Sequence, residues 1–190
     1  CKSGQEESIF LDPAAFQETI DGKETGLYKI SNANGMDVYV TNFGAVIPAI
    51  LHPNKDGVKE DIALGYDNVL SYSKGGDPNF GAVVGRYGNR IDMGTFELEG
   101  NTYSLPINET GNQNQLHGGV KGFGELVWDV DEVTENYITL SLESADGDMG
   151  YPGKLNLNVT YTLSDDDALE IVYTATTDAP TVLNITQHTY

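Results

Sequence analysis

Residues 81–119 read GAVVGRYGNRIDMGTFELEGNTYSLPINETGNQNQLHGG, a run of short apolar segments separated by glycines and asparagines. Glycine permits tight turns and close approach of a ligand to the backbone. The run places Asn89, Arg90 and His117 beside glycines, at positions where turns and short strands can aim them into one cleft. It predicts a chain of turns and strands that carries a candidate site.

Alternation of apolar and polar residues continues on both sides of this run, and it is typical of strands with one face turned inward. We expect strands in LYKISN, MDVYVTNF, GAVIPAILHP, EDIALGY, GTFELEG, NTYSLPIN, LVWDVDEV, YITLSLES, KLNLNVTYTL, ALEIVYTATT and TVLNITQHTY. The one expected helix covers residues 13–20, with Asp12 as its cap and Pro13 at its first position. Many short strands with almost no helix predict an all-β, antiparallel sandwich.

The composition restricts the class of partner. A chain of 190 residues is long enough for one domain with a substantial core. Its 10 Lys and Arg against 29 Asp and Glu give a formal charge of −19, which opposes binding to nucleic acid or to an anionic membrane surface. No apolar run is long enough to span a bilayer.

The only cysteine is Cys1, so no disulfide can form within the chain. A chain that opens CKSGQEES resembles a bacterial lipoprotein after removal of its signal peptide. On that interpretation Cys1 carries a lipid, residues 1–8 are a flexible tether, and the protein is extracytoplasmic, either periplasmic or membrane-anchored. The alternative is that the sequence was simply cut at this point.

The three histidines lie in different settings. His52 lies beside a turn, where a solvent-exposed loop side chain is expected. His117 is followed by glycines, which is typical of a ligand loop and equally of an ordinary loop. His188 ends an alternating run, and the polar row that it shares with Asn184, Thr186 and Tyr190 faces either solvent or a cleft.

The apolar run AVVG precedes Arg90 and Ile91 follows it, which predicts partial burial of its guanidinium. Its donors then need a carboxylate or ligand oxygens, in a structural salt bridge or in a binding site. Together with Asn89, the two site histidines, Trp128 and the many tyrosines, it is compatible with a sugar site. The sequence shows no metal-ligand spacing, no phosphate-binding glycine loop and no hydrolase nucleophile motif.

Six stretches, in order along the chain, resemble the aldose 1-epimerase (galactose mutarotase) family. They are NFGAVIPAILHPNKDG, IALGYDNVLSY, GRYGNRI with GTFELEG, LHGGVKGFGELVW, GYPGKLNLNVTYTL and LNITQHTY. The resemblance implies a β-supersandwich and interconversion of the α and β anomers of a free aldohexose, galactose or glucose, without a cofactor. It implies that His188 and His117 are catalytic: His188 as general acid to the ring oxygen, and His117 as a hydrogen-bond partner of the sugar. Asn89 and Arg90 match the substrate-binding pair.

In the family, the base glutamate and a substrate-binding aspartate follow the motif that here ends at Tyr190. We therefore expect residues 9–190 to be the N-terminal part of one sandwich domain, inactive without that continuation. Two alternatives remain open. The first is a non-catalytic carbohydrate-binding protein of the same fold. The second is a hexose-phosphate epimerase, which the acidic charge disfavours.

Overall fold

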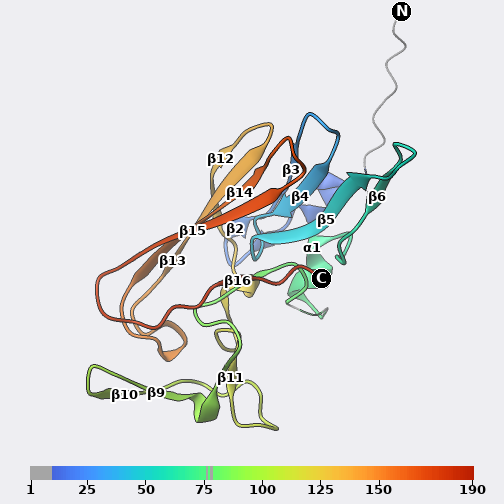
Figure 1. Ribbon diagram of the computed structural model, residues 1–190. Helices are drawn as coiled ribbons and strands as arrows, with labels where there is room; N and C mark the ends of the chain where they lie inside the picture. Colours follow the sequence, from blue (N-terminus) through green and yellow to red (C-terminus); the bar gives the residue numbers. More distant parts are fainter. Residues whose placement is uncertain (1–9, 76, 78) are drawn as a thin grey trace, which may run out of the picture.

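The computed structural model describes residues 10–75, 77 and 79–190. Two four-stranded antiparallel sheets form the body of the protein (Figure 1). The first has the order β3-β4-β5-β6 and the second the order β12-β13-β14-β15. Their strands are β3 (Leu27–Ser31), β4 (Asp37–Thr41), β5 (Val46–Pro53), β6 (Lys59–Asp61), β12 (Asp129–Val133), β13 (Tyr137–Ser144), β14 (Leu155–Leu163) and β15 (Leu169–Thr177).

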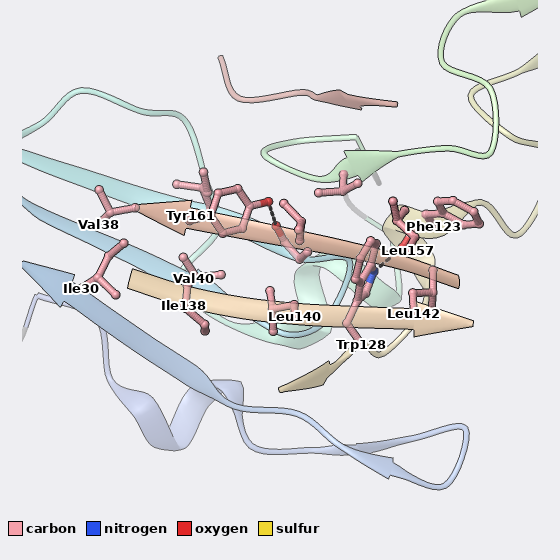
Figure 2. Packing of buried hydrophobic residues seen from close by; sticks show 14 of the residues in the cluster. Ile30, Val38, Val40, Phe123, Trp128, Ile138, Leu140, Leu142, Leu157 and Tyr161 are labelled. Carbon is pink, nitrogen blue, oxygen red and sulfur yellow. Dashed lines mark hydrogen bonds between the residues drawn. The ribbon is translucent and has the colours of Figure 1, made fainter. Parts of the chain in front are cut away.

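The sheets bury their apolar faces against each other, as Figure 2 shows for residues of β3, β4, β13 and β14. The alternation in β13 turns Ile138 and Leu140 inward, and β14 buries every second residue. Trp128 and Tyr161 anchor this core through hydrogen bonds, from the indole Nε1 to the Phe123 carbonyl (3.1 Å) and from the hydroxyl to the Ala45 carbonyl (2.7 Å). The predicted all-β sandwich is confirmed, but Trp128 belongs to the core and not to a sugar site.

A second apolar cluster covers the other face of β4 and β5, so every residue of β4 is buried. It is closed by a one-turn 3-10 helix, η1 (Pro13–Phe16), and by α1 (Val69–Ser73). Asp12 caps η1 as predicted, accepting from the Ala14 N–H (3.0 Å). The predicted helix is too long, because η1 ends at Phe16 and the chain already forms strand β1 from Thr19.

Two further predictions need correction. In EDIALGY only Glu60 and Asp61 lie in a strand, β6 (Lys59–Asp61). Helix α1, which was not predicted, follows and is capped by the Asn68 side chain, which accepts from the Ser71 N–H (2.8 Å). In TVLNITQHTY only Thr186–Gln187 forms a strand, β16. The predictions for Cys1 and for the tether concern residues outside the described ranges. Among those residues, no helix is long and apolar enough to cross a membrane.

The remaining elements are short. They are β1 (Thr19–Ile20), β2 (Lys23–Glu24), β7 (Val83–Val84), β8 (Arg90–Ile91), η2 (Asp92–Gly94), β9 (Thr95–Leu98), β10 (Asn101–Ser104), β11 (Gln115–Leu116), η3 (Phe123–Glu125) and η4 (Asp148–Gly150). The β9–β10 hairpin extends away from the two sheets (Figure 1).

Candidate functional site

A cleft of about 500 Å³ is bounded by two segments that are far apart in the sequence. One contributes Gly88, Asn89 and His117, and the other contributes residues 184–190. Three of the four predicted site residues, Asn89, His117 and His188, therefore line one cavity. Asn184, Thr186, His188 and Tyr190 of the polar row line this cleft together with the residues between them.

Backbone hydrogen bonds bring His188 to the cleft. Strand β16 pairs with β7, with Thr186 opposite Val84. Beyond the pair, the His188 N–H donates to the Ala82 carbonyl (2.9 Å) and its carbonyl accepts from the Gly81 N–H (3.1 Å). The backbone of His188 is thus fixed on both sides to the start of the 81–119 run.

His117 is placed by a close contact between backbones. The chain at Gly118 passes so near Gly85 that a Cβ built on Gly118 would lie 1.8 Å from the Gly85 carbonyl oxygen. Gly118 also has a φ of +88°, a conformation that glycine adopts without a steric penalty. The glycine after His117 is therefore required by the geometry that carries His117 to the cleft.

A hydrogen bond defines the tautomer of His117. Its Nδ1 accepts from the Asn89 N–H (3.0 Å), so the neutral ring carries its proton on Nε2. Burial lowers the pKa of His117, and the neighbouring His188 and Arg90 lower it further. His117 is thus suited to remain a neutral hydrogen-bond donor.

The His188 ring is held by other rings. It meets His117 edge-on, with centroids 5.2 Å apart, and lies 4.9 Å from the Tyr190 ring. Tyr190 in turn packs against Phe80 at 5.1 Å. Among the described residues the His188 imidazole makes no hydrogen bond to protein, which leaves both ring nitrogens available to a ligand.

Arg90 lies at the rim and is more open than predicted, since 49% of its side chain is exposed. It forms a two-point ion pair with Glu109, from Nη2 to Oε1 (2.7 Å) and from Nε to both oxygens (3.0 Å). Its Nη1 reaches the Asn89 Oδ1 at 3.3 Å, which links it to the cleft. The pair with Arg90 lowers the pKa of Glu109 to about 2.

The buried arginine of this segment is Arg86, which the sequence analysis did not single out. Only 1% of it is exposed, and its guanidinium donates to the carbonyls of Pro152 and Gly153 and to the hydroxyls of Ser144 and Thr181. These bonds tie the start of the site segment to β13, to the turn before β14 and to the chain leading to β16. Arg86 therefore supports the fold around the site.

A smaller pocket of about 140 Å³ shares His117 with the cleft and is also lined by Glu125. Burial raises the pKa of Glu125. Glu125 does not line the main cleft, so it is not placed as a base there. His52, the third histidine, is 41% exposed and lies 3.7 Å from Asp167, away from both pockets. Within the described ranges, no group of three His, Cys, Asp or Glu side chains is arranged to hold a metal.

Solved structures with the same fold include an aldose epimerase homologue from C. elegans (TM-score 0.82, 32% identity, 87% of this chain and 50% of that chain). Another is galactose 1-epimerase from Lactobacillus acidophilus (TM-score 0.79, 31% identity, 91% and 50%). Curated relatives include an aldose 1-epimerase of Haemophilus influenzae, 40% identical over 90% of this chain and 48% of the relative. Bovine galactose mutarotase is 42% identical over 80% of this chain and 43% of its own length.

This chain thus spans about half the length of the curated relatives that it matches. The sequence model of the family described as aldose 1-epimerase matches residues 26–190, which include the whole cleft. By this match, the chain belongs to the aldose 1-epimerase family.

Proposed function

We propose that this chain supplies the general acid and much of the sugar-binding surface of an enzyme that interconverts the α and β anomers of free aldohexoses. The observation that carries the proposal is the convergence of His188, His117 and Asn89 on one open cleft. Imidazole and amide groups around a cavity of this size match the hydroxyls and ring oxygen of a monosaccharide. The acidic net charge of −19 favours a neutral sugar over a phosphorylated one.

In the proposed reaction, protonated His188 donates its proton to the ring oxygen while a base removes the proton of the anomeric hydroxyl. The bond between C1 and the ring oxygen breaks, which leaves an open-chain aldehyde. Rotation about the C1–C2 bond presents the other carbonyl face. On ring closure His188 takes its proton back from the attacking hydroxyl and the base gives its proton to the aldehyde oxygen, so no net proton is consumed.

The two histidines take different roles because their rings are only 5.2 Å apart. A proton on one ring disfavours a proton on the other. His117 is committed to the neutral form by the Asn89 N–H, so the proton belongs on His188. His117 then offers its Nε2–H to a sugar oxygen.

The base is assigned to no described residue. We propose that it is a glutamate in the part of the family sequence that this chain does not span, and that the chain without that part binds sugar but does not accelerate mutarotation. The lipid on Cys1 and the extracytoplasmic location also stay predictions, which mass spectrometry of the protein purified from its own membranes can test.

Polarimetry tests the proposal. Freshly dissolved α-glucose and α-galactose are followed with this chain and with the complete gene product, with glucose 6-phosphate as the charged control. We expect acceleration by the complete gene product only, and for the free sugars in preference to the phosphate. Sugar binding without acceleration by either protein would instead identify a carbohydrate-binding protein. If neither protein binds sugar or accelerates mutarotation, the proposal is refuted.

A further inference from the structure

We propose that Glu109 is a positioning residue for sugar binding, which holds the Arg90 guanidinium in one orientation at the rim of the cleft. This inference rests on the proposed function. Surface ion pairs usually contribute little, because two flexible side chains must be ordered in water. The Arg90–Glu109 pair differs from that common case in its geometry and in its support.

The Arg90–Glu109 ion pair is bidentate. Nε and Nη2 of Arg90 both contact the Glu109 carboxylate, which fixes the plane of the guanidinium as well as its position. The remaining terminal nitrogen, Nη1, is directed to the Asn89 Oδ1. The edge of the guanidinium that is not bound to Glu109 is therefore the edge linked to the cleft.

The support comes from the loop that carries Glu109. Asn114 donates from Nδ2 to Glu109 Oε2 (2.8 Å), and backbone hydrogen bonds between Glu109 and Asn114 run in both directions (3.1 and 3.2 Å). The Glu109 side chain is only 20% exposed. The carboxylate is thus held by its own loop as well as by Arg90, which reduces the entropy cost of the pair.

The same loop also supports the other side of the site. The Asn108 side chain accepts from the Leu116 N–H (2.6 Å) and donates to the Leu116 carbonyl (2.9 Å), directly before His117. Strand β11 then pairs with β8, with Leu116 opposite Arg90. One loop, residues 108–114, therefore braces both His117 and Arg90, and Glu109 is its contact with Arg90.

Glu109 also balances charge near His117. Arg90 lowers the pKa of His117 and Glu109 raises it. The other charged groups that act on this ring are His188 and Asp77. Removal of the Glu109 charge leaves an uncompensated cation at the rim and frees the guanidinium to turn to solvent.

The test is a double-mutant cycle in the complete gene product, with KM for galactose as the readout. Glu109→Gln preserves shape and removes the charge, and we expect it to raise KM about three- to tenfold, the cost of ordering one long side chain on binding. In an Arg90→Met background the same change should have no further effect, because its target is gone. Glu143→Gln removes a matched exposed pair with Lys154 (2.6 Å) away from the cleft and should leave KM unchanged.

An unchanged KM in Glu109→Gln, or an equal rise in the Arg90→Met background, overturns the proposal, since a loop-folding role would act in both backgrounds. A second readout does not depend on catalysis. Exchange of the Arg90 Nε–H with water, followed by NMR, should be about tenfold faster in Glu109→Gln. If the wild-type protein neither binds nor converts sugar, the proposed function fails, and this exchange rate still decides whether Glu109 holds Arg90.

Discussion

The two-sheet body and the segment that carries the site are built differently. In the body, β13, β14 and β15 form continuous ladders of eight and nine paired residues. In the site segment, β7, β8, β11 and β16 have two residues each. Asn89 and His117 there have positive φ values of 71° and 56°, in the left-handed region that non-glycine residues seldom adopt.

The residues that stabilise the fold therefore differ from those that form the candidate site. The apolar side chains between the sheets hold the body. The site segment joins this core through Val83, and backbone contacts and polar anchors such as Arg86 hold the rest of it against the body. Unusual backbone angles in the site segment persist because the surrounding structure enforces them. Substitutions in the body should therefore change unfolding, and substitutions at the cleft should change sugar turnover.

The largest expected effect is at the cleft. His188→Asn in the complete gene product should lower turnover by about two to four orders of magnitude, the range for loss of a general acid. Its urea unfolding midpoint should stay near that of the wild type, because the imidazole bonds to no described protein group. His52→Asn is the control and should be silent in polarimetry. Normal turnover in His188→Asn would remove the acid role from this residue.

The matched change in the body is Leu140→Ala. Leu140 is fully buried between the sheets, and its truncation should lower the free energy of unfolding by about 2–5 kcal/mol. KM for the sugar should not change below the unfolding transition. Val172 is 46% exposed, so Val172→Ala should lower the free energy of unfolding much less. A selective rise of KM in Leu140→Ala would show that body and site are not separable.

Two glycines with similar backbone angles sharpen the comparison. Gly118→Ala places a Cβ against the Gly85 carbonyl oxygen at a φ of +88°, and should lower the free energy of unfolding by about 3 kcal/mol and weaken sugar binding. Gly100 has a φ of +81°, and a Cβ built on it would meet no atom within 4 Å beyond its chain neighbours. Gly100→Ala should therefore lower the free energy of unfolding by only about 1 kcal/mol and leave sugar binding intact. Equal costs, measured by urea unfolding, would argue against the close contact beside His117.

The smallest expected effect is on pH dependence. The pKa of His117 is lowered on folding, so its contribution to stability is complete above the ordinary value of about 6.5 and is lost as the pH falls through the lowered pKa. Glu109, with a pKa of about 2, keeps its pair with Arg90 over that interval. Imidazole ¹⁵N spectra should show His117 titrating below about 6.5, and at a higher pH in His188→Asn. Titration of His117 above 6.5 in the wild type would contradict this account.

Sequence patterns predict the body well because the side chains of a half-buried strand alternate with the pleat. The stretches YITLSLES and KLNLNVTYTL contain β13 and β14 to within one residue. The short helix α1 was missed, since five residues are too few for a helical period to emerge. TVLNITQHTY was read as one strand, although only two of its residues find a partner among the described strands.

At the site, the residue types were predictable and their settings were not. Asn89, His117 and His188 were predicted and line the cleft. Arg86 and Arg90 have similar neighbours in the sequence, yet one is buried among carbonyls and the other is exposed. The distinction depends on the distant partners Pro152, Gly153 and Glu109, and no local pattern encodes these partners. The glycines that follow His117 were the visible sign of close backbone contact, since a Cβ on Gly118 or on Gly122 would meet a carbonyl oxygen within 3 Å.

The pairing of β16 with β7 sets the order in which the protein can be assembled. The Asn184 Nδ2 donates to the Gly88 carbonyl across 96 residues of sequence, whereas β13, β14 and β15 pair with their immediate neighbours. Local hairpins close before contacts that require a long loop, because closure of the long loop costs more entropy. Strands β13, β14 and β15 can therefore pair with one another as soon as they are synthesised, whereas His188 meets His117 only when the long loop between β7 and β16 has closed. Sugar binding at this cleft would then report that folding of the whole segment has finished.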